Sequence, residues 1–273
     1  MAGIYLHIPF CKQACNYCDF HFSTSMKMKV DFVQAIIQEI ELRKDVFANE
    51  FISSVYFGGG TPSLLSKQDL DTIFEKLYKS FKIDADAEIT LEANPDDLTF
   101  EKIQQLKNSP VNRLSIGVQS FRDEDLKYMN RAHTAIEALN SIKMAQDEGF
   151  QNITIDLIYG TPGMSNEDWK YNLRKSFALN LPHISSYALT VEEKTPLYYQ
   201  ILKKNIGPVD EQQSADQFKV LMAEMLIYGY EQYEISNFCK YNSYSKHNSS
   251  YWKKGHYLGL GPSAHSYFGN LRL

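Results

Sequence analysis

Three of the four cysteines lie close together near the start of the chain, at Cys11, Cys15 and Cys18, and the fourth, Cys239, is far from them. A disulfide framework uses paired cysteines spread over a secreted chain, so this pattern favours free thiols in a reducing compartment. Thiolate sulfur is a soft ligand that suits zinc and iron–sulfur clusters. The three clustered cysteines are therefore candidate metal ligands, whereas Cys239 is expected to be a small buried residue.

Two metals fit this set of donors. Structural zinc takes four ligands, and His7 or His21 would have to supply the fourth. Such zinc sites usually combine two short ligand segments, and this sequence contains one. Three thiolates on one loop suit a [4Fe–4S] cluster, whose fourth iron then has no protein ligand and stays open for chemistry. The spacing favours the cluster, and a zinc-binding structural module remains the alternative.

Other small and polar residues fall where strand-like segments end. The turn that contains Gly59, Gly60 and Thr61 would allow a ligand to approach the backbone closely. It is neither a P-loop nor a dinucleotide fingerprint, because it lacks the residues that define those patterns. Further polar residues at such positions are Glu92, Gln119 and Asp156. Taken singly, each could equally be an ordinary polar side chain at a strand end, and Arg131 taken alone would more simply be a solvated charge.

Strands and helices alternate along the chain. Apolar, β-branched segments predict strands near Ile4, Val55, Ile89, Leu114, Ile153 and Ile184. Helical periodicity fills the intervals: two helices carry a Ser-x-x-Asp start signal, at Ser66 and Ser165, one begins near Ile136 and ends before Gly149, and a late one ends at Gly229. Strand-then-helix units in series predict a parallel sheet with right-handed crossovers.

The position of the polar groups bears on whether this sheet is flat or curved. Groups at the carboxyl ends of several different strands meet at one point only if the sheet curves, whereas an open sheet spreads them along its edge. We therefore expect an α/β fold, a partial (β/α)6 TIM-like barrel. After about residue 190 the rhythm stops, and an irregular α+β extension rich in Tyr, Ser, Asn and His follows, with His247 in a loop.

Composition limits the classes of function. The 273 residues include 28 basic and 33 acidic side chains, so the net charge of −5 argues against nucleic acid or an anionic membrane as a partner. The sequence has no apolar segment of the length of a membrane span and no signal peptide. We expect a cytoplasmic protein whose contact with membranes is at most peripheral.

The motifs together resemble the radical S-adenosylmethionine (radical SAM) superfamily and, within it, the family of oxygen-independent coproporphyrinogen III oxidase. The resemblance covers essentially the whole chain. It rests on the cysteine triad, the Gly-Gly-Gly-Thr-Pro turn and four further segments, which are Tyr5-Leu6-His7-Ile8-Pro9-Phe10, Leu91-Glu92-Ala93-Asn94-Pro95, Gly117-Val118-Gln119-Ser120-Phe121 and Asp156-Leu157-Ile158-Tyr159-Gly160.

The resemblance implies a role for each candidate residue. Cys11, Cys15 and Cys18 would ligate a [4Fe–4S] cluster whose open iron binds the amino and carboxylate groups of SAM. The remaining SAM contacts would be Gly59, Gly60 and Thr61 at the methionine end, Arg131 at the carboxylate, Glu92 and Asp156 at the ribose or in support, Gln119 in the same region, and Tyr5 and Tyr17 lining the pocket.

Two details favour a haem chaperone branch of this family over its decarboxylating oxidase. The oxidase carries an extra cysteine two residues after the third cluster ligand, where this chain has Phe20. The segment from His247 to Trp252 matches the His-Asn-x-x-Tyr-Trp signature of the chaperone branch. Imidazole is a common haem ligand, so His247 is a candidate to hold haem, although a histidine satisfied by protein groups is the alternative.

The resemblance therefore implies a protein that binds the cluster, SAM and haem, receives electrons from a donor and transfers haem to acceptor haemoproteins. The decarboxylating oxidase is the alternative enzyme, and we do not expect its activity here. Residues 1–190 would form the radical SAM partial barrel with the cluster and SAM site. Residues 191–273 would form the extension, cut short relative to a family whose members continue into a further helical domain.

Overall fold

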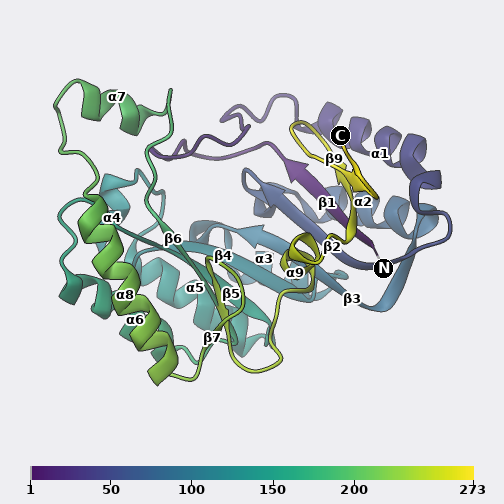
Figure 1. Cartoon of the computed structure of the whole chain (residues 1–273). Helices are drawn as coiled ribbons and strands as arrows, with labels where there is room; N and C mark the ends of the chain where they lie inside the picture. The colour runs from purple at the N-terminus through teal and green to yellow at the C-terminus, as the bar shows by residue number, and fades with distance from the viewer. Residues whose placement is uncertain (1) are drawn as a thin grey trace.

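The computed structural model describes residues 2–273, which form one continuous eleven-stranded sheet. Its centre is a set of parallel strands in chain order (Figure 1). These strands are β1 (Ala2–Ile8), β2 (Phe51–Gly59), β3 (Lys82–Ala93), β4 (Arg113–Gln119), β5 (Ile153–Tyr159) and β6 (His183–Ala188). Each contains one of the predicted strand centres, so the predicted parallel α/β sheet is confirmed.

The barrel is partial because β1 and β6 pair with later strands. β9 (His256–Leu260) runs parallel beside β1, and β8 (Asn237–Cys239) runs antiparallel beside β6. The sheet ends in β10 (Tyr267–Phe268) and β11 (Leu271–Arg272) at one edge and in β7 (Glu231–Gln232) at the other. The extension after residue 190 therefore supplies both edges of the sheet.

Helices connect the strands, and their starts follow from local sequence. The predicted capping boxes are confirmed: the Ser66 and Ser165 hydroxyls accept from the backbone N–H of Asp69 and Asp168. A third box, at Thr134, was not predicted. The α-helices are α1 (Lys29–Arg43), α2 (Lys67–Ser80), α3 (Phe100–Lys107), α4 (Asp123–Tyr128), α5 (Ala135–Asp147), α6 (Asn166–Ala178), α7 (Pro196–Leu202), α8 (Glu211–Ile227) and α9 (Lys246–Trp252), and the 3-10 turns are η1 (Lys44–Phe47), η2 (Pro62–Leu64) and η3 (Pro95–Asp97).

The helix predicted near Ile136 is confirmed as α5, which packs through Ala138, Ser141, Ile142 and Ala145, while Ile136 itself is 60% exposed. One local expectation was wrong. His247 lies in the short helix α9 and not in a loop, because the Ser245 hydroxyl caps the helix by accepting from a backbone N–H in its first turn.

Among residues 2–273, no helix is both long and apolar enough to cross a membrane.

The two faces of the central strands differ in polarity. One face carries buried aliphatic side chains such as Ile4, Leu6 and Val55, which pack with the apolar stripes of helices such as α1 and α2. The other face carries polar residues at every second position, among them Tyr5, Tyr56, Glu92, Arg113, Ser115, Asp156 and Ser185. Parallel strands buried on both faces are usually apolar throughout, so the alternation marks a polar barrel interior. Helix α9 contacts β1 and β2 (Figure 1).

Candidate cofactor site

A cavity of about 840 Å³ opens where the central strands end, and it is large enough for a small-molecule cofactor. Most of the residues singled out from the sequence line it together: Cys11, Cys15, Tyr17, Cys18, Gly59, Gly60, Thr61, Glu92, Gln119, Arg131 and Asp156. The other two candidates, Tyr5 and His247, line a smaller cavity that adjoins it. The curvature of the sheet thus gathers residues that lie far apart in sequence.

The cysteine loop is closed at its base and anchored in its middle. At its start, the backbone N–H of Cys11 donates to the carbonyl of Ser23 at 3.0 Å, and that of Ser23 donates to Pro9 at 2.7 Å. In its middle, the side chain of Asn16 donates to the carbonyl of Tyr128 at 2.9 Å. These bonds hold the loop over the end of the barrel, beside the glycine turn.

The donor set fits an iron–sulfur cluster. The three clustered cysteines are free and half-buried, and burial raises the pKa of Cys11 and, to about 11, that of Cys18. The raised pKa values favour the protonated thiols of Cys11 and Cys18, and metal binding would displace these two protons. Arg131 Nη1 lies 3.2 Å from the sulfur of Cys15, and the Thr61 hydroxyl donates to that of Cys11 at 3.5 Å. Such hydrogen-bond donors stabilise bound thiolate sulfur and influence the reduction potential of a cluster.

Zinc fits less well. His7, one of the two candidates for a fourth ligand, has both ring nitrogens in hydrogen bonds, to the Tyr5 hydroxyl at 3.2 Å and to the carbonyl of His21 at 2.8 Å. Within residues 2–273, no three His, Cys, Asp or Glu side chains are gathered as a finished metal site. The cysteine loop therefore provides three soft donors, and the ring of His7 is not free to be a fourth ligand.

The glycine turn packs tightly against the end of β1. Gly59 has a φ of 105°, and a Cβ there would lie 2.6 Å from the His7 ring. A Cβ on Gly60 would lie 2.7 Å from the carbonyl oxygen of Phe10, while its N–H donates to the carbonyl of Ile8 at 2.9 Å. Glycine is therefore required at both positions, and the exposed backbone faces the large cavity.

Arg131 crosses between the cysteine loop and β4. Beyond its contact with Cys15, its Nη2 donates to the side chain of Asn94 at 2.6 Å and to the carbonyl of Gly117 at 2.8 Å. Its Nε is buried and has no partner among residues 2–273. A buried donor without an acceptor is costly, so this atom fits a ligand carboxylate at the cavity wall.

Two carboxyl groups, Glu92 and Asp156, line both cavities. Glu92 accepts from the Tyr56 hydroxyl at 2.7 Å and from the N–H of Gly59 at 3.2 Å. Burial, reinforced by the charge of Asp156, raises the pKa of Glu92 to about 8. Burial also raises the pKa of Asp156 to about 6, and a hydrogen bond from Ser185 opposes the shift. Both groups can accept ligand hydroxyls, and Glu92 is mostly protonated at neutral pH, so it can also donate.

Gln119 ends β4 in a strained conformation, with a φ of 66°. Its side chain is 9% exposed and lines the large cavity. A Cβ on Gly117 would lie 3.0 Å from its Nε2, so the glycine leaves room for the amide. Non-glycine residues with a positive φ are uncommon, and they occur more often at active sites and ligand-binding sites.

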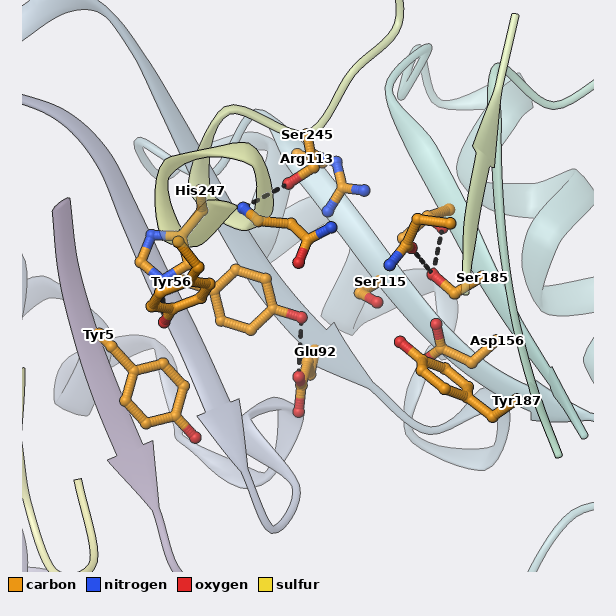
Figure 2. Close-up of a pocket in the computed structure, with 14 residues that line it drawn as sticks. Tyr5, Tyr56, Glu92, Arg113, Ser115, Asp156, Ser185, Tyr187, Ser245 and His247 are labelled. Carbon is orange, nitrogen blue, oxygen red and sulfur yellow. Dashed lines mark hydrogen bonds between the residues drawn. The ribbon is translucent and has the colours of Figure 1, made fainter. Parts of the chain in front are cut away.

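The smaller cavity, of about 220 Å³, lies inside the barrel (Figure 2). It shares four lining residues with the large cavity: Glu92, Ser115, Asp156 and Tyr187. Figure 2 shows Tyr56 pointing its hydroxyl at Glu92, with Arg113 and Ser245 above them. The two cavities therefore adjoin, one at the mouth of the barrel and one in its interior.

His247 is enclosed by protein groups. Its Nδ1 is hydrogen-bonded to the Ser54 hydroxyl at 2.9 Å, and its Nε2 to the Tyr251 hydroxyl at 2.9 Å. The ring stacks on Tyr56 with centroids 5.0 Å apart, and the side chain is 2% exposed. Burial, with the charge of Arg113, lowers the pKa of His247 to about 3, so the ring is neutral. To ligate iron, Nε2 would have to exchange Tyr251 for the metal.

Sequence reasoning missed several residues of the site. Asn94 fixes Arg131, and the interior residues Tyr56, Arg113, Ser185 and Tyr187 line the smaller cavity. A signal was present: polar residues recur with a period of two within strands whose other positions are aliphatic, as in Arg113-Leu114-Ser115-Ile116. This alternation predicts a polar interior face, whereas the aliphatic positions alone predict only the strands.

The fold and this site define a class. The Radical SAM superfamily pattern matches residues 5–175. The coproporphyrinogen III oxidase HemN from Escherichia coli, a radical SAM enzyme, superposes with a TM-score of 0.84 at 27% identity over 98% of this chain and 65% of its own. The archaeal Elp3 of Methanocaldococcus infernus shares the fold, with a TM-score of 0.55. The chain belongs to the radical SAM superfamily.

Within this superfamily, the chain is similar to curated haem chaperones. HemW of Bacillus subtilis is 37% identical over the whole of this chain and 72% of its own length. HemW of Escherichia coli is 37% identical over 96% of this chain and 69% of its own. The chain is a member of the HemW branch and spans about two thirds to three quarters of the length of these relatives.

Proposed function

We propose that this chain binds a [4Fe–4S] cluster, SAM and haem, and transfers haem to acceptor haemoproteins. The observation that carries the proposal is the similarity to HemW haem chaperones along the whole chain, together with a cavity that contains the cluster and SAM candidates. A bound cluster would supply an electron for cleavage of the SAM sulfonium. A separate protein would act as the electron donor.

The residues of the chain hold and orient the ligands in this proposal. Cys11, Cys15 and Cys18 provide the sulfur donors, and the Nε of Arg131 pairs with the SAM carboxylate. The backbone of Gly59 and Gly60, with Thr61, meets the methionine end. Glu92, Asp156 and Gln119 lie further along the cavity, where Glu92 and Asp156 accept ribose hydroxyls. Tyr17 belongs to the cysteine loop and lines the large cavity, and Tyr5 lies on the interior side, against His7 and Tyr56.

The extension would serve haem. In this proposal residues 1–190 form the radical SAM part and residues 191–273 bind haem, with His247 as the candidate ligand. Because both of its ring nitrogens are already hydrogen-bonded, ligation requires α9 to release Tyr251 from His247. The half-buried His256, which pairs with Glu50, and the exposed His265 compete for this role. A cytoplasmic location stays a prediction from the sequence.

Haem transfer is the test of the function. Anaerobically reconstituted protein should bind haem with a Soret band, and mixing with apomyoglobin should convert that band to the spectrum of myoglobin. Free haem at the same concentration is the control for spontaneous uptake. Failure to bind haem, or transfer no different from free haem, would contradict the proposal.

Decarboxylation is the second candidate function, and the structural similarity to HemN favours it. Phe20, at the position of the oxidase's extra cysteine, lines the large cavity and is 65% exposed. We expect no conversion of coproporphyrinogen III to protoporphyrinogen IX by the reconstituted protein with SAM and reductant. Catalytic turnover in that assay would make the oxidase the correct assignment.

A further inference from the structure

The smaller cavity contains a buried cation that none of the roles above uses. Arg113 begins β4, and its side chain is 3% exposed. It lines the interior cavity (Figure 2) and not the large one. Arg131 lines the large cavity and not the interior one. The connected space therefore has one arginine at its mouth, beside the cysteines, and another in its interior.

The guanidinium of Arg113 makes no hydrogen bond within residues 2–273. Its nearest carboxylate is Glu88, with Nε and Oε2 3.9 Å apart, beyond hydrogen-bonding distance. Glu88 already serves α9: it accepts from the Ser245 hydroxyl at 3.1 Å and from the N–H groups of Lys246 and His247, both at 3.0 Å. The N–H donors of Arg113 are therefore available to another acceptor.

The surroundings of Arg113 suit an anionic group that also accepts hydrogen bonds. A buried cation without an acceptor is costly, and a guanidinium matches a carboxylate through two parallel hydrogen bonds. Hydroxyl and amide side chains surround the same space: Ser115, Thr154, Ser185, Asn237 and Asn248. Of the two carboxyls that face it, Glu92 has a pKa raised to about 8 and is mostly neutral at pH 7, so it repels an anion weakly. Asp156, with a pKa raised to about 6, stays mostly charged and is the group that a bound anion has to tolerate.

The connected cavities contain two arginines, and one SAM molecule can account for only one of them. SAM has one carboxylate, which Arg131 is placed to pair. A second buried arginine in the adjoining cavity calls for a second anionic group, which a SAM molecule held at the mouth does not have. We propose that Arg113 binds a carboxylate arm of the molecule that the connected cavities hold, and this rests on the proposed function, under which the arm is a haem propionate.

Haem and haem dimethyl ester, in which both propionates are uncharged, test this directly. Wild-type protein should bind haem about tenfold to a hundredfold more tightly than the ester, the range expected for a charge-assisted hydrogen-bonded pair. Arg113→Gln should lower haem affinity by the same factor and leave ester affinity unchanged. Arg113→Lys keeps the charge but not the paired geometry, so it should retain part of the preference.

Arg174→Gln, the same change on an exposed residue of α6, is the matched control and should bind both compounds like wild type. Circular dichroism checks that each variant is folded. Equal wild-type affinities for haem and its ester would overturn the proposal even if Arg113→Gln cannot be purified. A full preference retained by folded Arg113→Gln would also overturn it while leaving the chaperone function intact. No binding of either compound by wild type would overturn both.

Discussion

Replacement of Glu88 should detach α9 from the barrel. This carboxylate is 6% exposed and accepts three hydrogen bonds from residues 245–247 at the start of α9. In Glu88→Ala those three donors lose their acceptor, and Arg113 loses its only nearby ion-pair partner among residues 2–273. A hydrogen bond contributes about 1 kcal/mol, and one to a charged acceptor about 1.5 kcal/mol, so the three bonds to Glu88 account for the loss. We therefore expect a loss of about 3–5 kcal/mol in the free energy of unfolding.

Urea unfolding measures this loss. With a slope of about 3 kcal/mol/M, the midpoint should fall by about 1–2 M without a change in slope. Hydrogen exchange should report faster exchange of the α9 amides, because their helix loses its anchor. Glu88→Gln, which keeps one acceptor oxygen, should lose less stability than Glu88→Ala.

Glu41→Gln is the matched control, because Glu41 pairs with Lys44 and Lys76 on the exposed surface, where such pairs contribute little. Its unfolding midpoint should stay at the wild-type value. The reasoning is refuted if Glu88→Ala unfolds at the same urea concentration as this control, or if exchange in α9 is unchanged.

Three further outcomes are expected. Anaerobic reconstitution should give about four irons and four sulfides, and Ala at any one of the three clustered cysteines should abolish the response of the cluster's EPR signal to SAM; tightly bound stoichiometric zinc with no cluster would contradict this. In the folded protein Glu92 keeps its proton up to about pH 8, whereas in the unfolded chain it loses the proton near the ordinary pKa of 4.5. The free energy of unfolding should therefore fall as the pH rises from 4.5 to 8. Urea unfolding measured across this pH range should show a smaller fall for Glu92→Gln. His247→Ala should weaken haem binding or shift the Soret band, with Ala variants of His256 and His265 in parallel; an unchanged spectrum and affinity would reject His247 as ligand.

Much of the fold and of the cofactor site could be predicted from sequence, because both depend on local patterns. Aliphatic segments located the central strands, and the Ser-x-x-Asp signals at Ser66 and Ser165 located helix starts, since each pattern acts over a few neighbouring residues. The spacing of the three clustered cysteines limited the expected metal site to zinc or an iron–sulfur cluster, because thiolates are soft ligands. The polar residues at strand ends predicted a common cavity, because a curved parallel sheet brings its carboxyl ends together.

Other features depend on contacts between segments that are distant in sequence. No local pattern shows that β9 pairs with β1, or that α9 is fastened to the barrel interior by Glu88, about 160 residues away along the chain. The environment of His247 follows from that contact: Ser54 and Tyr251 bind its two nitrogens, and burial keeps it neutral. Arg113 is likewise buried in the barrel interior, where residues of α9 line the same cavity. Residue type determined which chemistry each side chain can do, and tertiary packing decided which partners and charge states it has, because burial and hydrogen bonding are properties of the assembled fold.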